Sequence, residues 1–346
     1  MNGFQALRKE KGLTQAELAS ASGIRQATIS AIEQGQTRPR VATRQRLAEA
    51  LQISLDVLEE ALVLKGRGAS PSDWPFLQGL DRDLREGLAQ ALVCDWTHHS
   101  TSLEGNTISA GDTLFILQEG LTISGKSLRE HQEIHGHAQA LNLLSAWLHH
   151  PSAIQLSHLH QLHRAVQTGA DLDAFAPIGA WKIEDNGTMV LTTGGERVWH
   201  DYSRRHHIPA LMQQWFSEFQ HLMRQPLSRA DELLDAFTQI HLSFTAITPY
   251  ADGNGRLARL LANLPLLRAG HPPLIIQSDS RKPYITLLGD YTLRRGLVSP
   301  DGTDLVCTGP EYDALIAFFR TQWQTSQTLV SEFHQRQERR HKIPFE

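Results

Sequence analysis

The chain has 346 residues, 40% of them hydrophobic and 20% charged, with a formal net charge of −4. This length is enough for two domains that each bury a core, and the composition is typical of a soluble globular protein. We expect neither a membrane span nor a secretory signal, because no long apolar run occurs and the N-terminus is polar. The only cysteines are Cys94 and Cys307, so we predict a cytoplasmic protein without a disulfide framework.

The first fifty residues are locally basic, with eight Arg or Lys against four Glu. Thr14 followed by Glu17 is a capping-box pattern, which predicts a helix that begins at Gln15. Gly23 then marks a turn, and apolar residues at helical spacing predict a second helix over residues 25–35, RQATISAIEQG. The segment therefore predicts a helix, a glycine turn and another helix.

Residues 13–40, LTQAELASASGIRQATISAIEQGQTRPR, resemble the lambda-repressor-like (Cro/CI-type) helix-turn-helix family. The resemblance implies binding to a double-stranded DNA operator as a homodimer, with the second helix in the major groove. We assign base contacts to Arg25, Gln26, Thr28 and Ser30, and phosphate contacts to Arg38, Arg40 and Arg44. A small helical bundle that uses its basic surface for protein contacts is the alternative.

The middle of the chain suggests two domains. Gly, Ser and Pro gather without periodicity after the basic segment. We predict a helix-turn-helix domain at 1–63, a linker at 64–76 and a second domain at 77–346. The second domain shows amphipathic helices, such as 81–98 and 207–222, and one β-hairpin around 181–198. The fold class predicted is all-α with one small hairpin.

The segment 241–261, HLSFTAITPYADGNGRLARLL, places a glycine-rich loop between two helical patterns. Backbone N–H groups of such a loop, at the positive end of the next helix, suit an anion. Two guanidinium groups that follow suit a polyphosphate. The residues of this predicted anion site are Asp252, Gly253, Asn254, Gly255, Arg256 and Arg259.

This segment resembles the signature of the Fic family, and the resemblance extends over residues 90–290, with a domain core at about 95–295. It implies a helical Fic fold and AMP transfer from ATP to a hydroxyl side chain of a target protein. By resemblance, Asp252 holds Mg²⁺, the residues 253–255 cradle phosphates, and Arg256 and Arg259 contact them. No structural metal is expected.

Two further segments fit the resemblance. STSLEGN, residues 100–106, is similar to the family's N-terminal inhibitory motif, with Ser100, Glu104 and Gly105 in place. In relatives this glutamate pairs with the second signature arginine, which implies a contact between Glu104 and Arg259 that nucleotide must displace. The hairpin corresponds to the flap that aligns the target, with Lys182 where Arg is common.

The chain departs from the family at Thr248, which stands where the signature has its catalytic histidine. That histidine takes the proton from the attacking hydroxyl, and a threonine hydroxyl cannot do so at neutral pH. His241 lies two helical turns away, about 10 Å, and is expected to be a packed helix residue. We therefore expect weak or negligible transfer.

Three functions remain open from the sequence. The first is a DNA-binding transcription regulator, a repressor or autoregulator, whose Fic domain senses nucleotide or dimerises. The second is a protein adenylyltransferase autoinhibited by Glu104. The third is a toxin–antitoxin-like interaction module. A metal site at His131, Glu133, His135 and His137 is disfavoured because the order differs from that of zinc proteases.

Overall fold

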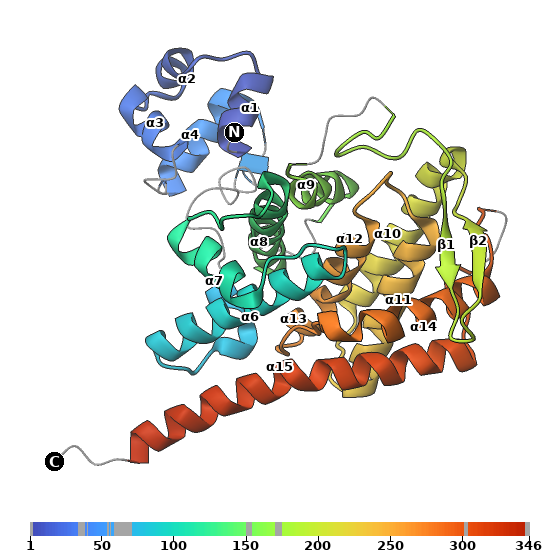
Figure 1. Ribbon diagram of the computed structural model, residues 1–346. Helices are drawn as coiled ribbons and strands as arrows, with labels where there is room; N and C mark the ends of the chain where they lie inside the picture. Colours follow the sequence, from blue (N-terminus) through green and yellow to red (C-terminus); the bar gives the residue numbers. More distant parts are fainter. Residues whose placement is uncertain are drawn as a thin grey trace. The chain divides into compact units, whose positions relative to one another are not determined.

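The computed structural model describes residues 3–33, 39, 41–53, 55, 57–58, 71–149, 154–169, 175–300 and 304–342. The chain forms two compact units, Met1–Ser70 and Pro71–Glu346. The described residues form helices and one two-stranded antiparallel sheet, which confirms the all-α fold class with a small hairpin (Figure 1). Within these ranges no helix has the length and apolar character needed to cross a bilayer.

The smaller unit contains α1 (Gly3–Glu10), α2 (Gln15–Ser22), α3 (Gln26–Glu33) and α4 (Val41–Leu51). The predicted capping box is confirmed: Thr14 Oγ1 accepts from the Glu17 N–H at 3.2 Å, and the Glu17 carboxylate accepts from the Thr14 N–H at 2.7 Å. Helix α2 ends at Gly23, whose φ of 65° is in the left-handed region. The helix, turn and helix are therefore set by local sequence signals.

A buried ion pair joins the helices of the smaller unit. Arg8 Nε donates to Glu33 Oε1 at 2.5 Å, and both residues are 6% exposed. Gln15 Nε2 donates to the other Glu33 oxygen at 2.7 Å, so α1, α2 and α3 share one carboxylate. Removal of either charge would leave the other buried and unpaired, which is strongly destabilising.

The larger unit is a helical body that carries the hairpin. Its elements are η1 (Pro71–Asp73), η2 (Pro75–Leu77), α6 (Arg82–Ser102), α7 (Ala110–Glu119), α8 (Leu128–His149), α9 (Leu156–Val166), β1 (Gly187–Leu191), β2 (Arg197–Asp201), η4 (Arg205–His207), α10 (Ile208–Arg224), α11 (Ala230–Ile247), α12 (Asn254–Ala262), α13 (Leu264–Arg268), η5 (Ser278–Ser280), α14 (Arg281–Arg295) and α15 (Pro310–Lys342).

The larger unit begins earlier than the expected linker of residues 64–76 allows. Trp74 is 1% exposed, its Nε1–H donates to Ser145 Oγ at 2.9 Å, and its ring lies 6.3 Å from that of Trp96. Burial of this large aromatic ring anchors residues 71–77 on α6 and α8. Residues 71–76 are thus part of the packed body.

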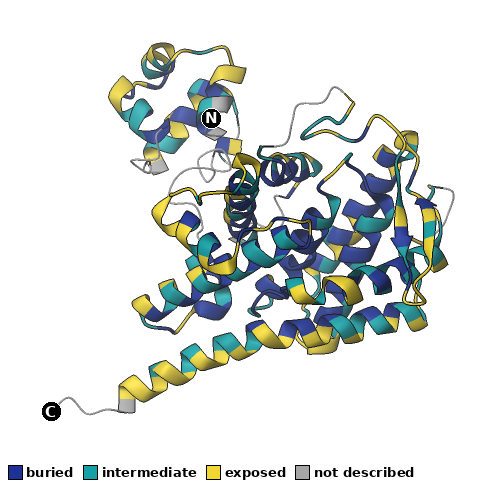
Figure 2. Ribbon diagram, in the orientation of Figure 1, coloured by how far each residue is buried: buried dark blue, intermediate teal, exposed yellow. Residues whose placement is uncertain are grey.

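Helix α11 lies at the centre of the larger unit and packs against α10, α12, α13 and α15. It is buried around its circumference, as expected for a core helix, and Figure 2 shows this interior in dark blue. Phe244 contacts Trp215 of α10 and Phe237 contacts Phe319 of α15, both in edge-to-face geometry. The end of α11 is therefore held firmly where the predicted anion loop begins, the loop of residues 248–253 between α11 and α12.

The hairpin is displaced from its predicted position of residues 181–198. Strands β1 and β2 pair Gly187 with Asp201 and Leu191 with Arg197, and the turn contains Gly195 at a φ of 84°. The segment before β1 is held elsewhere, because the Lys182 N–H donates to the Pro249 carbonyl at 2.9 Å. This contact joins the hairpin segment to the anion loop.

Candidate functional site

The anion loop connects α11 to α12 and is closed by its own asparagine. Asn254 Oδ1 accepts from the Tyr250 N–H at 3.0 Å, and Asn254 Nδ2 donates to the Tyr250 carbonyl at 2.9 Å. Gly253 has a φ of 78° at the helix N-cap, and no side chain caps α12. Gly253 therefore offers no side-chain acceptor to the first N–H groups of α12, and the positive end of a helix suits an anion.

Arg256 lies beneath the loop and is 5% exposed. Its Nη1 donates to the Val166 carbonyl at 2.8 Å, and its Nη2 lies 3.4 Å from both Gln167 Oε1 and Asp252 Oδ2. Its buried Nε has no hydrogen-bond partner. A buried donor without a partner is costly, so the site fits an oxyanion that would satisfy it. The Asp252 side chain is 68% exposed at the rim.

Arg259, one turn further along α12, is 4% exposed and paired with the end of α6. Its Nη2 donates to Glu104 Oε1 at 2.6 Å and to the Ser100 carbonyl at 2.9 Å, and its Nε donates to Ser100 Oγ at 3.1 Å. The contact that the resemblance implied between Glu104 and Arg259 is present. Gly105 follows with a φ of 103°, which turns the chain away from α6.

Gly255 lies directly beside the Glu104 carboxylate. A Cβ at this position would lie 2.8 Å from Glu104 Oε1 and 3.1 Å from Arg259 Nη1. The glycine therefore leaves space for an anionic group between the first turn of α12 and Arg259. A carboxylate at the N-terminal turn of a helix is electrostatically favourable, and Glu104 fills this position in the present structure.

Thr248 caps α11 in an unusual backbone conformation. Its φ of 49° and ψ of 66° are left-handed, which is rare for a β-branched residue. The side chain is buried, and Oγ1 donates to the Thr245 carbonyl at 2.6 Å. The hydroxyl thus uses its proton within α11 and supplies no group that titrates near neutral pH.

The titratable groups around Thr248 are poor substitutes for a histidine. Tyr202 hydrogen-bonds to Thr248, and burial raises the pKa of its hydroxyl. Burial lowers the pKa of Lys182 to about 8, but its Nζ donates to Asn186 Oδ1 at 2.6 Å. His241 is fully buried against Tyr284, and burial together with Arg259 lowers the pKa of its imidazole to about 3. The expectation that His241 is a packed helix residue is confirmed.

In the smaller unit, the residues assigned to base contacts lie at the start of α3. Arg25 and Gln26 are exposed, while Thr28 and Ser30 are half-buried. Ile29 and Ile32 lie on the opposite, buried side of the helix. Arg38 and Arg40, assigned to phosphate contacts, lie outside the described residues.

The histidine-rich segment of α8 is occupied by ordinary hydrogen bonds. His131 Nε2 accepts from the Ile123 N–H at 2.8 Å, and Glu133 accepts from Asn106 and Arg129. His137 is fully buried, lies 3.2 Å from Thr97 Oγ1 and has its pKa lowered to about 3 by burial and the nearby arginines. Among the described residues, no three potential ligands are grouped to hold a metal ion.

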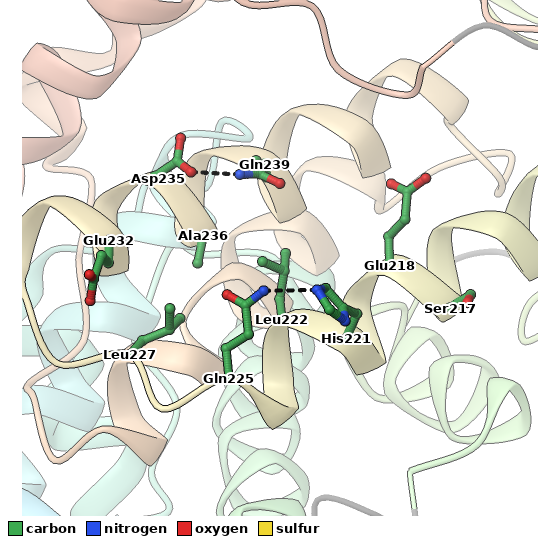
Figure 3. A pocket seen from close by; sticks show the side chains of 10 residues that line it. All are labelled: Ser217, Glu218, His221, Leu222, Gln225, Leu227, Glu232, Asp235, Ala236 and Gln239. Atoms are coloured by element: carbon green, nitrogen blue, oxygen red, sulfur yellow. Dashed lines mark hydrogen bonds between the residues drawn. The ribbon is translucent and has the colours of Figure 1, made fainter.

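A cavity of about 690 Å³ opens between α10 and α11, away from the anion loop (Figure 3). Its lining includes the carboxyl side chains of Glu218, Glu232 and Asp235. Asp235 accepts from Gln239 Nε2 at 2.6 Å and from the Tyr312 hydroxyl at 2.5 Å. Carboxylates repel phosphate groups, so this cavity does not suit the ligand class that the loop suits.

One feature of the site was missed from the sequence. Tyr250 is fully buried between His163, which stacks on it at 3.9 Å, and His160, whose Nδ1 lies 3.0 Å from the tyrosine hydroxyl. Both histidines come from α9, about ninety residues earlier in the chain. No local motif marks them, because only the fold brings α9 against α12.

Comparison with known proteins identifies both units. Residues 4–58 match the helix-turn-helix family, and residues 153–266 match the Fic/DOC family. The chain combines a helix-turn-helix domain with a Fic/DOC domain. The Fic/DOC match extends from α9 through the hairpin and the anion loop to α13, so it includes Thr248.

Curated relatives share the Fic domain. Protein adenylyltransferase fic-1 of Caenorhabditis briggsae is 32% identical over 286 residues, covering 74% of this chain and 51% of the relative. Protein adenylyltransferase Fic of Drosophila mojavensis is 31% identical over 254 residues, covering 72% and 45%. The chain thus spans about half the length of these relatives.

Solved structures share the fold. A Fic domain containing signaling protein from Bacteroides thetaiotaomicron has a TM-score of 0.63 at 23% identity and covers 75% of this chain and 94% of that chain. Fic-1 (residues 134–508) from Caenorhabditis elegans has a TM-score of 0.54 at 22% identity and covers 91% and 86%. These similarities concern the fold alone.

Proposed function

We propose that this protein is a DNA-binding transcription regulator whose Fic domain binds ATP with Mg²⁺ and senses it without efficient transfer. The observation that carries the proposal is the combination, in one loop, of an intact anion cradle with Thr248. The N–H groups at the start of α12 and the orphaned Arg256 Nε suit phosphate oxygens. The buried Thr248 hydroxyl, bonded to Thr245, lacks the basicity for proton abstraction.

Bound ATP would lie with its phosphates along residues 253–255, and Asp252 at the rim would hold Mg²⁺. The cation would neutralise phosphate charge and orient the phosphates. Arg259 would contact the terminal phosphate, and this requires that Glu104 release its 2.6 Å contact with that guanidinium. We therefore propose that Glu104 acts as a built-in competitor of nucleotide.

DNA recognition is assigned to the exposed N-terminal residues of α3. Arg25 suits two hydrogen bonds to guanine and Gln26 suits adenine. The regulator would bind a two-fold symmetric operator as a homodimer, as such domains do. If nucleotide binding shifts a dimer or domain equilibrium, then operator and ATP affect one another's affinity reciprocally.

Titration calorimetry with ATP and Mg²⁺ tests the nucleotide half of the proposal. Heat of saturable binding at micromolar to millimolar ATP is expected, and its absence at millimolar ATP would contradict the proposal. For the DNA half, Arg25→Ala and Gln26→Ala should reduce discrimination between operator and random DNA. Arg40→Ala should weaken both alike and reduce the salt dependence.

A second candidate function is protein adenylyltransferase activity, which is favoured by the relatives of that name at 30–32% identity. It predicts AMP transfer by the Glu104→Gly variant, in which Thr248 is unchanged. Mass-detected AMP transfer by Glu104→Gly, compared with the Thr248→His, Glu104→Gly double variant, separates the two functions. General-base assistance is worth about 10² to 10⁴ in rate, so the regulator function predicts transfer only by the double variant.

A further inference from the structure

His163 connects the anion loop to the segment that leads into the hairpin. Its imidazole is 1% exposed and stacks on Tyr250 with ring centroids 3.9 Å apart and planes 11° apart. One ring nitrogen, Nδ1, lies 2.8 Å from the Gly179 N–H, and the other, Nε2, lies 3.1 Å from the Asp252 carbonyl oxygen. Both partners of the ring are backbone groups, so neither contact involves a side chain of the family signature.

These two partners determine the protonation state of His163. The Gly179 N–H can only donate, so Nδ1 must be the unprotonated, accepting nitrogen. The Asp252 carbonyl can only accept, so Nε2 must carry the proton and donate. The ring is therefore neutral, in the Nε2–H tautomer.

The hydrogen bond from His163 to the Asp252 carbonyl fixes the orientation of the whole peptide group between Asp252 and Gly253. The Asp252 C=O and the Gly253 N–H belong to one trans peptide and point in opposite directions. With the carbonyl held by His163, the Gly253 N–H is directed to the other side, where it contacts the Asp252 carboxylate. That carboxylate belongs to a side chain that is 68% exposed, whereas Gly253 itself is buried.

The same end of α9 supports the loop at a second point. The Val166 carbonyl accepts from Arg256 Nη1 at 2.8 Å, so α9 contacts the loop both before and after its glycines. Arg164 Nη1 donates to the Gly179 carbonyl at 3.3 Å, and a Cβ on Gly179, whose φ is 74°, would overlap this arginine. Gly179 is thereby bound through its N–H by His163 and through its carbonyl by Arg164, two neighbouring residues of α9.

We propose that His163 is a positioning residue of the nucleotide site, whose ring holds the Asp252–Gly253 peptide and so fixes the Gly253 N–H together with the Asp252 carboxylate that it contacts. The inference rests on the nucleotide binding proposed above. It adds that the acceptor nitrogen of the same ring sets the position of Gly179, and so of the segment before the hairpin. Nε2 holds the Asp252 carbonyl and Nδ1 holds the Gly179 N–H. The amide side chains of glutamine and asparagine differ in length, so each can replace one of these two contacts.

Two variants of the full chain separate the tasks. In His163→Gln the longer amide reaches the place of Nε2, where its N–H₂ group can donate to the Asp252 carbonyl. In His163→Asn the shorter amide reaches the place of Nδ1, where its oxygen can accept from the Gly179 N–H. Titration calorimetry with ATP and Mg²⁺ is expected to give nearly unchanged affinity for Gln and about tenfold weaker affinity for Asn.

His158→Gln is the matched control, because His158 is a buried histidine of the same helix that caps its N-terminus through Nδ1 and the Gln155 N–H. It should lower the melting temperature without weakening ATP binding. Equal losses of affinity in His163→Gln and His163→Asn, at similar melting temperatures, would overturn the inference. Failure of the unaltered chain to bind ATP would instead count against the proposed function.

A spectroscopic measurement on the unaltered chain needs no variant to fold. Long-range ¹H–¹⁵N correlation spectra distinguish the Nε2–H tautomer from the Nδ1–H tautomer and from the imidazolium. The signals of His163, assigned through their absence in either variant that folds or by sequential assignment, are expected to show the Nε2–H tautomer at pH 7. The other tautomer or a charged ring would refute the positioning role, whatever the ATP affinity.

Discussion

Gly289 of α14 lies against Leu191 of β1 so closely that a Cβ on Gly289 would overlap the Leu191 carbonyl oxygen. The contact sets the hairpin directly on α14. It is supported at the turn, where Thr193 Oγ1 donates to Asp290 Oδ2 at 2.5 Å. The hairpin is thus seated on a helix position that only glycine allows.

Gly289→Ala should therefore displace the hairpin and destabilise the larger unit by about 1–3 kcal/mol, because the obstacle is a backbone atom. The melting temperature and hydrogen exchange of residues 187–201 measure the effect. Gly111→Ala is the control, since this α7 glycine has open space at its Cβ position. That change should stabilise by about 0.5–1 kcal/mol. Equal effects of the two substitutions would contradict the packing described.

Thr248→Asn should stabilise the larger unit, because asparagine tolerates the left-handed conformation that threonine resists. A gain of about 1 kcal/mol corresponds to an increase in melting temperature of about 2 °C. Thr245→Asn, at a helical position one turn earlier, should give no gain. If both substitutions raise the melting temperature, the left-handed backbone at Thr248 is not the cause of the stabilisation.

Glu104→Gly should strengthen ATP binding by about tenfold, because it removes a charge-assisted contact with Arg259 that nucleotide must displace. Glu104→Gln keeps the shape of the side chain but not its charge, so its ATP affinity should lie between those of the unaltered chain and Glu104→Gly. The exposed α6 pair of Arg82 and Glu86 supplies the control Glu86→Gln, expected to have no effect. Calorimetric affinities in which Glu104→Gly binds no better than the unaltered chain would exclude competition by Glu104.

Stability should fall as the pH decreases from about 6.5 toward 4. Burial is the main cause that lowers the pKa of His137 and His241 to about 3 and of His163 to about 4. Below the ordinary histidine pKa the unfolded chain binds protons that the folded chain does not, so each group contributes up to about 1.4 kcal/mol per pH unit. From about one pH unit above the ordinary histidine pKa, these groups are neutral in both states and contribute no slope.

Urea unfolding followed by tryptophan fluorescence measures this slope for the larger unit alone, because Trp74, Trp96, Trp147, Trp181, Trp199, Trp215 and Trp323 all lie within it. His241→Gln should make the slope shallower between pH 6.5 and 4. His221→Gln, on the exposed side of α10, is the matched substitution that should not. If the unfolding free energy of His241→Gln depended on pH as steeply as that of the unaltered chain, the prediction would be wrong.

Local signals in the sequence predicted those parts of the fold that local interactions determine. The capping box at Thr14 and Glu17 located α2, and the spacing around Pro249 located the loop between α11 and α12. The hairpin was predicted to begin too early, because the Lys182 N–H donates to the Pro249 carbonyl and this long-range contact fixes the segment before β1 on the loop. The linker was extended too far because Trp74 finds its partners on α6 and α8.

The chemistry of the site could be predicted only in part, because some of its features depend on contacts between distant parts of the chain. A substitution such as Thr248 is evident from the residue type, and the ion pair of Glu104 with Arg259 followed from the resemblance. The left-handed backbone at Thr248 and the support that α9 gives to the loop depend on distant parts of the chain. His163 could not be distinguished in sequence from the other histidines.

The loop keeps its shape through Asn254 at its centre and through α9 from below, and the side chain of residue 248 takes no part in either support. In the proposed function, nucleotide binding and AMP transfer are therefore physically separable properties of this loop. On that proposal, a change at this one position would convert a nucleotide-binding regulator into a transferase, or the reverse, without altering the loop that holds the phosphates.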